Sequence, residues 1–420
     1  MTAEQIQSSS PASTAGADGR STAHVRRIAL LGPYASRNLG DTATQMAVGA
    51  NLRRRCPDVQ IVGVSPDPED TLNSLGIPAF PLSGRGPSSG QFAEQYPGGA
   101  SLLQKRRRHW PRIALRMARF VRSLDMLVVS GGGQLDDYWG GAFGHPWTML
   151  LWTVLARVCG VPVVYLGVGL DRLGTPLSRR FAVLALQLAK FRSFRDAATQ
   201  AAMHDLGVRG RSMVCPDLAF SLPLGEPGTP APARRFAVIN PISQKTWAHG
   251  QDERQEVYLQ QLAETGAWLA ARGLALRVVC SQTTMDGADA RRLMQMLAGR
   301  DVPDVEVCVT PTVADYVAQV RDADVVIGAR LHGVILALVA GSPVVALSPL
   351  PKVERVMEDA GLAQFCLPLQ SFRTPDLIDR VALALSRVHE LRAHIASVNA
   401  QFRAQLMLTL DEVVALMPAR

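Results

Sequence analysis

Cysteine is sparse in this chain of 420 residues, and its placement excludes two classes of site. The six cysteines form no Cys-x-x-Cys pair and no cluster with histidine. Such spacing supports neither a structural zinc site nor a disulfide framework. We therefore expect no bound metal, and we expect the cysteines to be small core residues of a protein in the reducing cytoplasm.

Long apolar runs are also absent. Residues 1–24 are rich in Ser, Thr, Ala and Gly, and they lack the apolar stretch of a secretory signal. The most apolar window, Trp147–Leu170, is interrupted by Arg157, Gly160 and Pro162. It cannot supply the roughly 20 uninterrupted apolar residues that a membrane span needs. We expect a disordered tail over 1–24, and we expect the apolar window to form a buried helix followed by a buried strand.

Acidic residues are missing from one stretch, Lys105–Arg122, which holds eight lysines and arginines. Ile113, Met117, Phe120 and Val121 recur there with the spacing of one helix face. In one interpretation this helix docks on an anionic membrane surface, at the inner face of the membrane, or on a carrier-linked glycan. In the other it is a solvated basic face covering a hydrophobic seam. A nucleic-acid partner is not expected, because no binding motif or aromatic platform accompanies the arginines.

What the chain has in abundance is the alternation of short apolar strands with helical segments. Hydrophobic residues make up 47% of it, and its 35 glycines and 27 prolines suit many tight connections. Strands such as Arg27–Gly32 and Asp125–Ser130 are followed by a second series that begins at Phe236–Asn240. This alternation indicates α/β domains with parallel, right-handed, doubly wound sheets.

The length allows two domains of ordinary size, each with its own core. The best linker contains three prolines and two glycines. We expect a disordered tail (1–24), a first Rossmann-like domain (25–224), a linker (225–235), a second Rossmann-like domain (236–374) and C-terminal helices that pack back across the first domain (375–420).

One strand–turn–helix unit places charge at the edge of a sheet. Residues 324–327 are predicted as a buried strand and Leu331–Ala340 as a core helix, with Arg330 and His332 at the junction. Open α/β sheets bind ligands at this edge. Arg330 can grip a carboxylate or phosphate, and His332 can transfer a proton near neutral pH. The alternative is that Arg330 pairs with a structural carboxylate and that His332 is a satisfied, half-buried histidine.

The turn Asn38–Asp41 precedes a predicted helix and has the composition of a ligand-binding loop. A helix N-terminus presents free backbone N–H groups to an anion or a sugar hydroxyl, and Gly40 allows close approach. The alternative is that Asp41 or Thr42 simply caps the helix.

A second such turn follows the strand Asp125–Ser130. Three consecutive glycines begin there, and Gly132 and Gly133 would let a ligand approach the backbone. Either Asp136 or Asp137 can then accept hydrogen bonds from sugar hydroxyls. These features predict a carbohydrate-binding edge in the first domain.

Seven short motifs occur in a specific order: Asn38–Asp41, Gly131–Gly133, Arg195–Asp196, Pro216–Asp217, Arg330–His332, Gly341–Pro343 and Lys352. Together they resemble the polysaccharide pyruvyl transferase family, over roughly residues 27 to 360. The resemblance implies a GT-B-like pair of Rossmann-type domains, the first on the acceptor side and the second on the donor side. The family often carries an aromatic residue shortly before the lysine that matches Lys352, where this chain reads Ser348-Pro-Leu-Pro.

The resemblance also implies a reaction without a cofactor. A pyruvyl group passes from phosphoenolpyruvate to a pair of hydroxyls on a polysaccharide or its precursor, free or lipid-linked, to form a pyruvate ketal. Such chemistry needs a proton donor and a clamp for two anions, which a histidine and arginines supply. We assign His332 and Arg330 as catalytic. The predicted donor site comprises Arg195, Arg330, Leu331, His332 and Lys352, and the predicted acceptor site comprises Asn38, Gly40, Asp41, Gly132, Gly133 and Asp136.

Two other functions fit the same patterns. A nucleotide-sugar glycosyltransferase shares the two-domain architecture and would bind a nucleotide sugar in place of phosphoenolpyruvate. A non-catalytic module that binds glycans or membranes through Lys105–Arg122 would keep its binding without His332 and would form no product.

Overall fold

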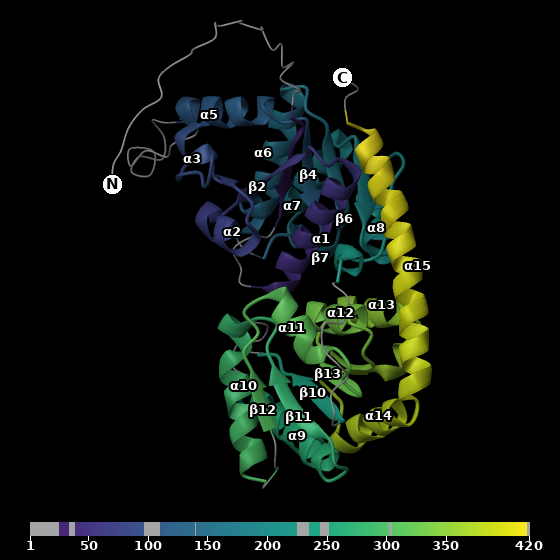
Figure 1. Ribbon diagram of the computed structural model, residues 1–420. Coiled ribbons are helices and arrows are strands. Elements are labelled where there is room, and N and C mark those ends of the chain that lie inside the picture. The colour runs from purple at the N-terminus through teal and green to yellow at the C-terminus, as the bar shows by residue number, and fades with distance from the viewer. Residues whose placement is uncertain are drawn as a thin grey trace, which may run out of the picture.

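The computed structural model describes residues 25–32, 38–95, 110–138, 140–224, 235–243, 252–300, 302 and 305–417. Two parallel sheets form two lobes, and Figure 1 shows these lobes stacked end to end with the long helix α15 (Val388–Ala415) beside both. The predicted α/β class with two Rossmann-like units is confirmed. The tail 1–24 and most of the expected linker, 225–234, lie outside the described residues, so the exact domain boundaries stay a prediction.

The sheet of the N-terminal lobe has seven strands within the described residues. In spatial order they are β3 (Ala79–Pro81), β2 (Gln60–Ser65), β1 (Arg27–Leu31), β4 (Met126–Ser130), β6 (Val163–Val168), β8 (Phe191–Phe194) and β9 (Met213–Val214). Neighbouring strands are parallel, and a short ladder of β5 (Leu135–Asp136) and β7 (Leu170–Arg172) lies beyond this sheet. The central strands are mostly apolar and buried, as expected where helices cover both faces of a parallel sheet.

Successive residues of a strand pack alternately into two separate hydrophobic cores. On β1, Ile28 and Leu30 join the core that continues into the second lobe, whereas Ala29 and Leu31 join the core on the opposite face. The helices of this lobe are α1 (Leu39–Arg55), α2 (Pro68–Leu75), α3 (Phe92–Gln95), α5 (Trp110–Arg122), α6 (His145–Val158), α7 (Pro176–Leu188) and α8 (Ala197–Asp205), with short 3-10 turns at Gly141–Phe143 and Leu218–Ser221 (η2). Helix α1 packs on the first core, and α5, α6 and α7 pack on the second.

The C-terminal lobe repeats the arrangement with six strands among the described residues. Their order is β12 (Val305–Cys308), β11 (Ala275–Val279), β10 (Phe236–Asn240), β13 (Val325–Gly328), β14 (Val344–Ser348) and β15 (Cys366–Pro368), and the helices are α9 (Asp252–Ala270), α10 (Thr283–Ala298), α11 (Val313–Val320), α12 (Leu331–Val339), α13 (Pro351–Asp359) and α14 (Thr374–Ser386). All neighbouring strands are parallel. Helix α12, the predicted core helix, is buried along its whole length.

The apolar window Trp147–Leu170 forms helix α6 and strand β6, as predicted. Both elements are part of the N-terminal core, where Trp152 and Val163 are fully buried. In the described part of the chain, no helix has the length and apolar character needed to cross a bilayer.

Helix α15 connects the two lobes. Its first half contacts the C-terminal lobe, where Asn399 donates a hydrogen bond to the carbonyl of Leu338 at 2.7 Å. Its second half contacts the N-terminal lobe: Phe402 lies edge-to-face on Phe220 with ring centroids 4.9 Å apart. One helix therefore packs against both sheets' cores and limits their relative movement.

The basic stretch forms helix α5, but only from Trp110 onward; residues 105–109 lie outside the described residues. Its apolar face is buried in the N-terminal core and so is not available to a membrane. Arg116 is also occupied, because it donates to the carbonyls of Gly84 and Arg85 and lies 4.7 Å from the ring centroid of Phe80. For these residues the structure favours the second interpretation, a basic helix that covers a hydrophobic seam.

We predict that the substitution Phe402→Ala lowers the free energy of unfolding by about 3–5 kcal/mol, because it removes a buried ring that joins α15 to the N-terminal lobe. Leu408→Ala on the same helix is the control: Leu408 is 67% exposed, so its loss should stay within about 0.5 kcal/mol. Urea unfolding followed by circular dichroism measures both. Equal unfolding curves for the two variants would contradict the proposed role of α15.

Candidate functional site

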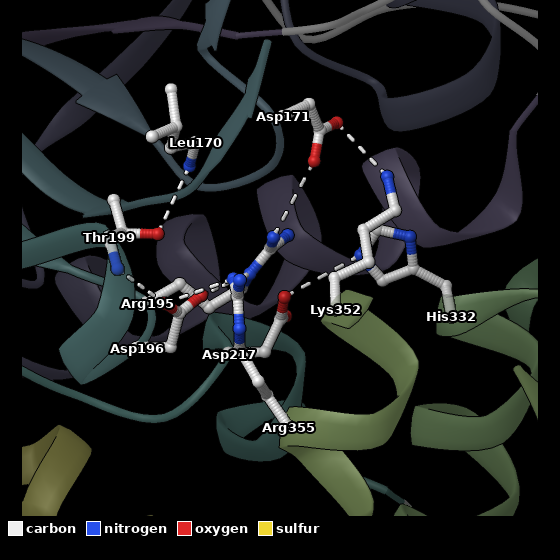
Figure 2. Close-up of polar contacts among 9 residues, drawn as sticks. All are labelled: Leu170, Asp171, Arg195, Asp196, Thr199, Asp217, His332, Lys352 and Arg355. Carbon is white, nitrogen blue, oxygen red and sulfur yellow. Dashed lines mark hydrogen bonds and ion pairs between the residues drawn. The ribbon is translucent and has the colours of Figure 1, made fainter. Parts of the chain in front are cut away.

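The two lobes meet where the strands of both sheets end. The N-terminus of α1 lies against the C-terminal lobe, and the backbone N–H of Leu39 donates to the carbonyl of Ser281, just after β11, at 3.1 Å. Charged side chains from both lobes converge beside this contact (Figure 2). Because open α/β sheets bind ligands at the carboxyl ends of their strands, this junction is the expected place for a site.

His332 lies in the first turn of α12 and points toward the N-terminal lobe (Figure 2). Its Nε2 atom is 3.7 Å from Oδ2 of Asp217, whose other carboxylate oxygen caps η2 by accepting from the N–H of Ala219. Burial alone would raise the pKa of Asp217, but its interactions with His332 and with the charge of Arg195 outweigh burial and lower that pKa. Asp217 is therefore an ionised carboxylate facing an imidazole.

Gly40 makes room for His332. A Cβ atom at position 40 would lie 1.9 Å from Cγ of the His332 ring, so only glycine allows α1 to approach this side chain. The local amides are also used within the protein: Asn38 Oδ1 caps α1 by accepting from the N–H of Gly40 at 3.0 Å. Asn38 thus caps the helix, in place of Asp41 or Thr42. Asn38 and Gly40, which we predicted as ligand contacts, lie where the two lobes meet.

Arg195 follows β8 and is almost fully buried, with its side chain 3% exposed. Its Nη2 lies 3.9 Å from Oδ1 of Asp171, and its Nε lies 3.8 Å from Oδ2 of Asp196. Gly169 allows this placement, since a Cβ there would be 2.5 Å from Nη2 of Arg195. These separations exceed hydrogen-bond distance, so the guanidinium has charge neighbours while its Nη2 makes no hydrogen bond with the described residues.

Lys352, in the first turn of α13, pairs with Asp171 of β7 at 3.0 Å, which joins the two lobes. Gly133 again provides space, since a Cβ there would be 2.2 Å from Oδ2 of Asp171. Gly132, with φ of 68°, has the left-handed backbone that glycine readily adopts. The predicted residues Lys352 and Gly133 therefore lie beside one carboxylate, and Gly132 adjoins Gly133.

Asp136 and Asp137 have different surroundings. Asp137 is buried and accepts hydrogen bonds from the N–H groups of Gly174 and Thr175, so it orders the turn before α7. Asp136 is half-buried. Burial raises its pKa, and repulsion from Asp171 and Asp137 adds to this effect, against an opposing backbone hydrogen bond from Tyr138. Of the two alternatives, Asp136 is the carboxyl group whose pKa is raised, which makes its carboxylate the stronger base.

Arg330 is held by a residue of its own lobe. Its Nε and Nη2 atoms donate to the two carboxylate oxygens of Asp286 at 2.8 and 2.7 Å, and Asp286 also accepts from the N–H of Ser243. Asp286 is completely buried. This bidentate pair matches the alternative interpretation, a structural carboxylate, and it fixes the turn that carries the buried Leu331 and His332.

Three buried polar atoms at the junction have no hydrogen-bond partner among the described residues: Nη2 of Arg195, Oδ2 of Asp217 and Nε2 of His332. Burying such groups unpaired costs about 1–3 kcal/mol each, or more when they are charged. A pocket of about 220 Å³ is lined in part by Arg195, Asp217, Lys352 and Arg355. His332 does not line this pocket, and it lies behind Asp217, 3.7 Å from that carboxylate. The pocket is smaller than the roughly 300–1,000 Å³ of drug-sized sites, which suits a small anion.

The sequence did not identify three acidic partners. Asp217 belongs to the Pro216–Asp217 motif, but the sequence did not indicate its role. Asp171 follows a buried strand that ends in glycines, the same pattern that indicated a ligand-binding edge at Gly131–Gly133. Asp286 carries no comparable signal, because nothing in its segment indicates a charge partner 44 residues away. Among the described residues, no group of three or more His, Cys, Asp or Glu side chains is arranged to hold a metal ion.

Two parallel α/β lobes that face each other across a polar junction define a GT-B-like protein. Solved structures agree. UDP-GlcNAc 2-epimerase from Neisseria meningitidis, bound to UDP-GlcNAc, has a TM-score of 0.58 at 10% identity, covering 93% of this chain and 99% of that one. A glycosyltransferase from Rickettsia africae has a TM-score of 0.57 at 10% identity, covering 93% and 97%. At such identities the likeness shows the fold alone.

The family follows from sequence. The model of the polysaccharide pyruvyl transferase family matches residues 38–351, and the chain belongs to this family. The match begins at the cap of α1 and ends at the start of α13, so it spans Arg195, Asp217 and His332. No curated protein matches the chain.

We predict that Gly40→Ala destabilises the protein by about 1–3 kcal/mol, since the added methyl overlaps the His332 ring. In a His332→Ala background the same change should cost much less, because the obstacle is gone. Gly49→Ala on the same helix is the control, since its nearest neighbour would be 3.8 Å away. Chemical unfolding of the four-variant cycle measures the coupling. An equal cost of Gly40→Ala in both backgrounds would exclude the contact.

Proposed function

We propose that the protein transfers the pyruvyl group of phosphoenolpyruvate to two hydroxyls of a sugar in a polysaccharide or its precursor, forming a pyruvate ketal and releasing phosphate. The observation that supports this most is that Arg195, Asp217 and His332 at the lobe junction each leave one buried polar atom without a hydrogen bond among the described residues. A cation and a proton-transfer group are what an enol phosphate requires. Family membership supports the same reaction.

The chemistry divides into addition and elimination. A proton adds to the methylene carbon of phosphoenolpyruvate, and the electron pair of the double bond forms the new C–H bond. The first sugar hydroxyl attacks the resulting cationic carbon and loses its proton. The C–O bond to phosphate then breaks, and the second hydroxyl attacks the same carbon and loses its proton. One of the two hydroxyl protons restores the proton used in the first step, and the other leaves with phosphate.

His332 is the proposed general acid that protonates the methylene carbon, and it becomes the base for an acceptor hydroxyl. Asp217 Oδ2 lies 3.7 Å from its Nε2 atom, so a carboxylate attracts the positive charge that the ring carries during the proton transfer. Because both side chains are nearly excluded from water, this electrostatic effect is stronger than it would be at the surface.

Arg195 is the proposed clamp for the donor's carboxylate or phosphate, and its Nη2 atom is the unpaired donor that such an anion would satisfy. Lys352 and the half-exposed Arg355 add positive charge around the same pocket. Arg330 acts indirectly in this proposal, since its pair with Asp286 holds the turn that presents His332.

The acceptor is proposed to lie against the N-terminal lobe, along Gly132, Gly133 and Asp136, with Asp41 at the start of α1 close to His332 through Gly40. Asp136 is the proposed base for one acceptor hydroxyl, since its raised pKa favours proton uptake. The six free cysteines fit a cytoplasmic setting for this reaction.

The direct test is to incubate the purified protein with phosphoenolpyruvate and a panel of glycosides that carry free hydroxyl pairs, and to measure phosphate release and the pyruvylated product. We expect phosphate only when a suitable glycoside is present. If the protein releases no phosphate from phosphoenolpyruvate but turns over a nucleotide sugar, it is a glycosyltransferase. Glycan binding without any product would identify a binding module.

We predict that His332→Ala lowers kcat by a factor on the order of 10² or more, the usual scale for a lost proton-transfer group. His389→Ala, an exposed histidine on α15, is the matched control and should keep parent activity. Phosphate release at saturating phosphoenolpyruvate measures both, with circular dichroism to verify folding. A folded His332→Ala enzyme with parent kcat would remove His332 from the mechanism.

We predict that Arg195→Lys raises the KM for phosphoenolpyruvate by about tenfold, because an ammonium keeps the charge but cannot reproduce the planar fork. Arg211→Lys is the control, as Arg211 forms an exposed pair with Glu412. Initial rates across a phosphoenolpyruvate titration separate KM from kcat. Parent KM in Arg195→Lys would show that the donor is bound elsewhere.

A further inference from the structure

Helices α6 and α7 expose apolar side chains on the outer surface of the N-terminal lobe. The six residues that define this α6–α7 face are Phe143, Val154, Val158, Leu177, Leu184 and Leu188, and Phe143 and Val158 are 70% and 76% exposed. Val154 and Val158 of α6 are four residues apart, and Leu177, Leu184 and Leu188 of α7 are seven and four apart, so each set lies on one side of its helix. Phe143 lies in the 3-10 turn just before α6. The opposite side of each helix packs on the sheet, so this face is a second apolar surface.

An outward apolar stripe is unusual for helices that cover a parallel sheet, since their outer side is normally polar. Here the stripe is also organised. Phe143, Trp147 and Phe181 form a cluster with ring centroids 5.2 to 6.3 Å apart, which joins the beginnings of α6 and α7. Because α6 and α7 also pack against each other, the exposed apolar side chains of both helices lie on neighbouring elements.

The charged side chains on these two helices and on the neighbouring α5 have a single sign, whereas α8, on the other side of α7, ends in the exposed Asp205. Helices α5, α6 and α7 contain seven arginines and no aspartate or glutamate. Arg112, Arg119, Arg157 and Arg180 are exposed on them. An apolar strip on helices that carry arginines and no acids has the composition of surfaces that lie in the interface of an anionic bilayer, where aliphatic and aromatic groups insert and arginines contact lipid phosphates.

We propose that the α6–α7 face, with its border of arginines, docks the protein on the surface of an anionic lipid bilayer. A second copy of the chain is a poorer occupant: a two-fold interface sets each patch against itself, which would place arginines opposite arginines. The face begins beside the site, because Asp136 and Asp171 lie on the short strands that precede α6 and α7. A docked enzyme would thus hold its acceptor side close to the lipid surface.

This inference does not depend on the proposed reaction, and it is tested without substrates. The purified full chain is sedimented with vesicles of phosphatidylcholine alone or of phosphatidylcholine with phosphatidylglycerol, at low and at high salt. We expect binding to the anionic vesicles only, and we expect salt to weaken it. The double variant Val158→Glu/Leu184→Glu should bind the anionic vesicles at least roughly tenfold more weakly than the parent, since two inserted apolar groups become charged.

Leu408→Glu is the matched control, because Leu408 is 67% exposed on α15, away from this face. It should sediment like the parent, and both variants should keep the parent's circular dichroism spectrum. Absence of parent binding to anionic vesicles, or equal binding by parent and double variant, would overturn the proposal. So would a parent dimer in analytical ultracentrifugation that the double variant converts to monomer, since the face would then join two copies.

Discussion

The contact between Gly40 and His332 sets the relation of the two lobes, and the candidate site depends on it. The helix α1 of one lobe reaches the ring of the other because position 40 lacks a Cβ, and the Leu39–Ser281 backbone bond fixes the approach. Gly133 and Gly169 also lack a Cβ where a side chain approaches: Asp171 lies against Gly133, and Arg195 lies against Gly169. Glycine in these turns gives space to charged neighbours, and the side chains supply the chemistry.

The buried charges at the junction fall into two kinds. Arg330 and Asp286 satisfy each other through two hydrogen bonds, and such a pair mainly holds geometry. Arg195, Asp217 and His332 each leave an atom without a partner among the described residues, although they are almost as deeply buried. A folded protein bears that cost where a ligand later supplies the missing bond, which is why these three carry the proposed chemistry.

Much of the fold could be predicted from the sequence, because apolar strands and helices are local patterns. Helix α12 and the window that became α6 and β6 are examples. The partners of the charged residues could not be predicted, since they depend on how distant segments pack: Lys352 and Asp171 are 181 residues apart. For the same reason the sequence could not predict that Arg330 pairs with Asp286, 44 residues away. The amphipathic pattern of α5 correctly predicted a helix. It could not predict that the apolar face of this helix packs against the protein's own core.

The central claim is that the two lobes together form a pocket for a small three-carbon anion. Calorimetric titration of phosphoenolpyruvate into the protein, with UDP-GlcNAc titrated in parallel, tests it most directly. We expect saturable binding of phosphoenolpyruvate, lost in Arg195→Ala, and much weaker binding of the nucleotide sugar. Tight binding of UDP-GlcNAc with no heat from phosphoenolpyruvate would contradict it.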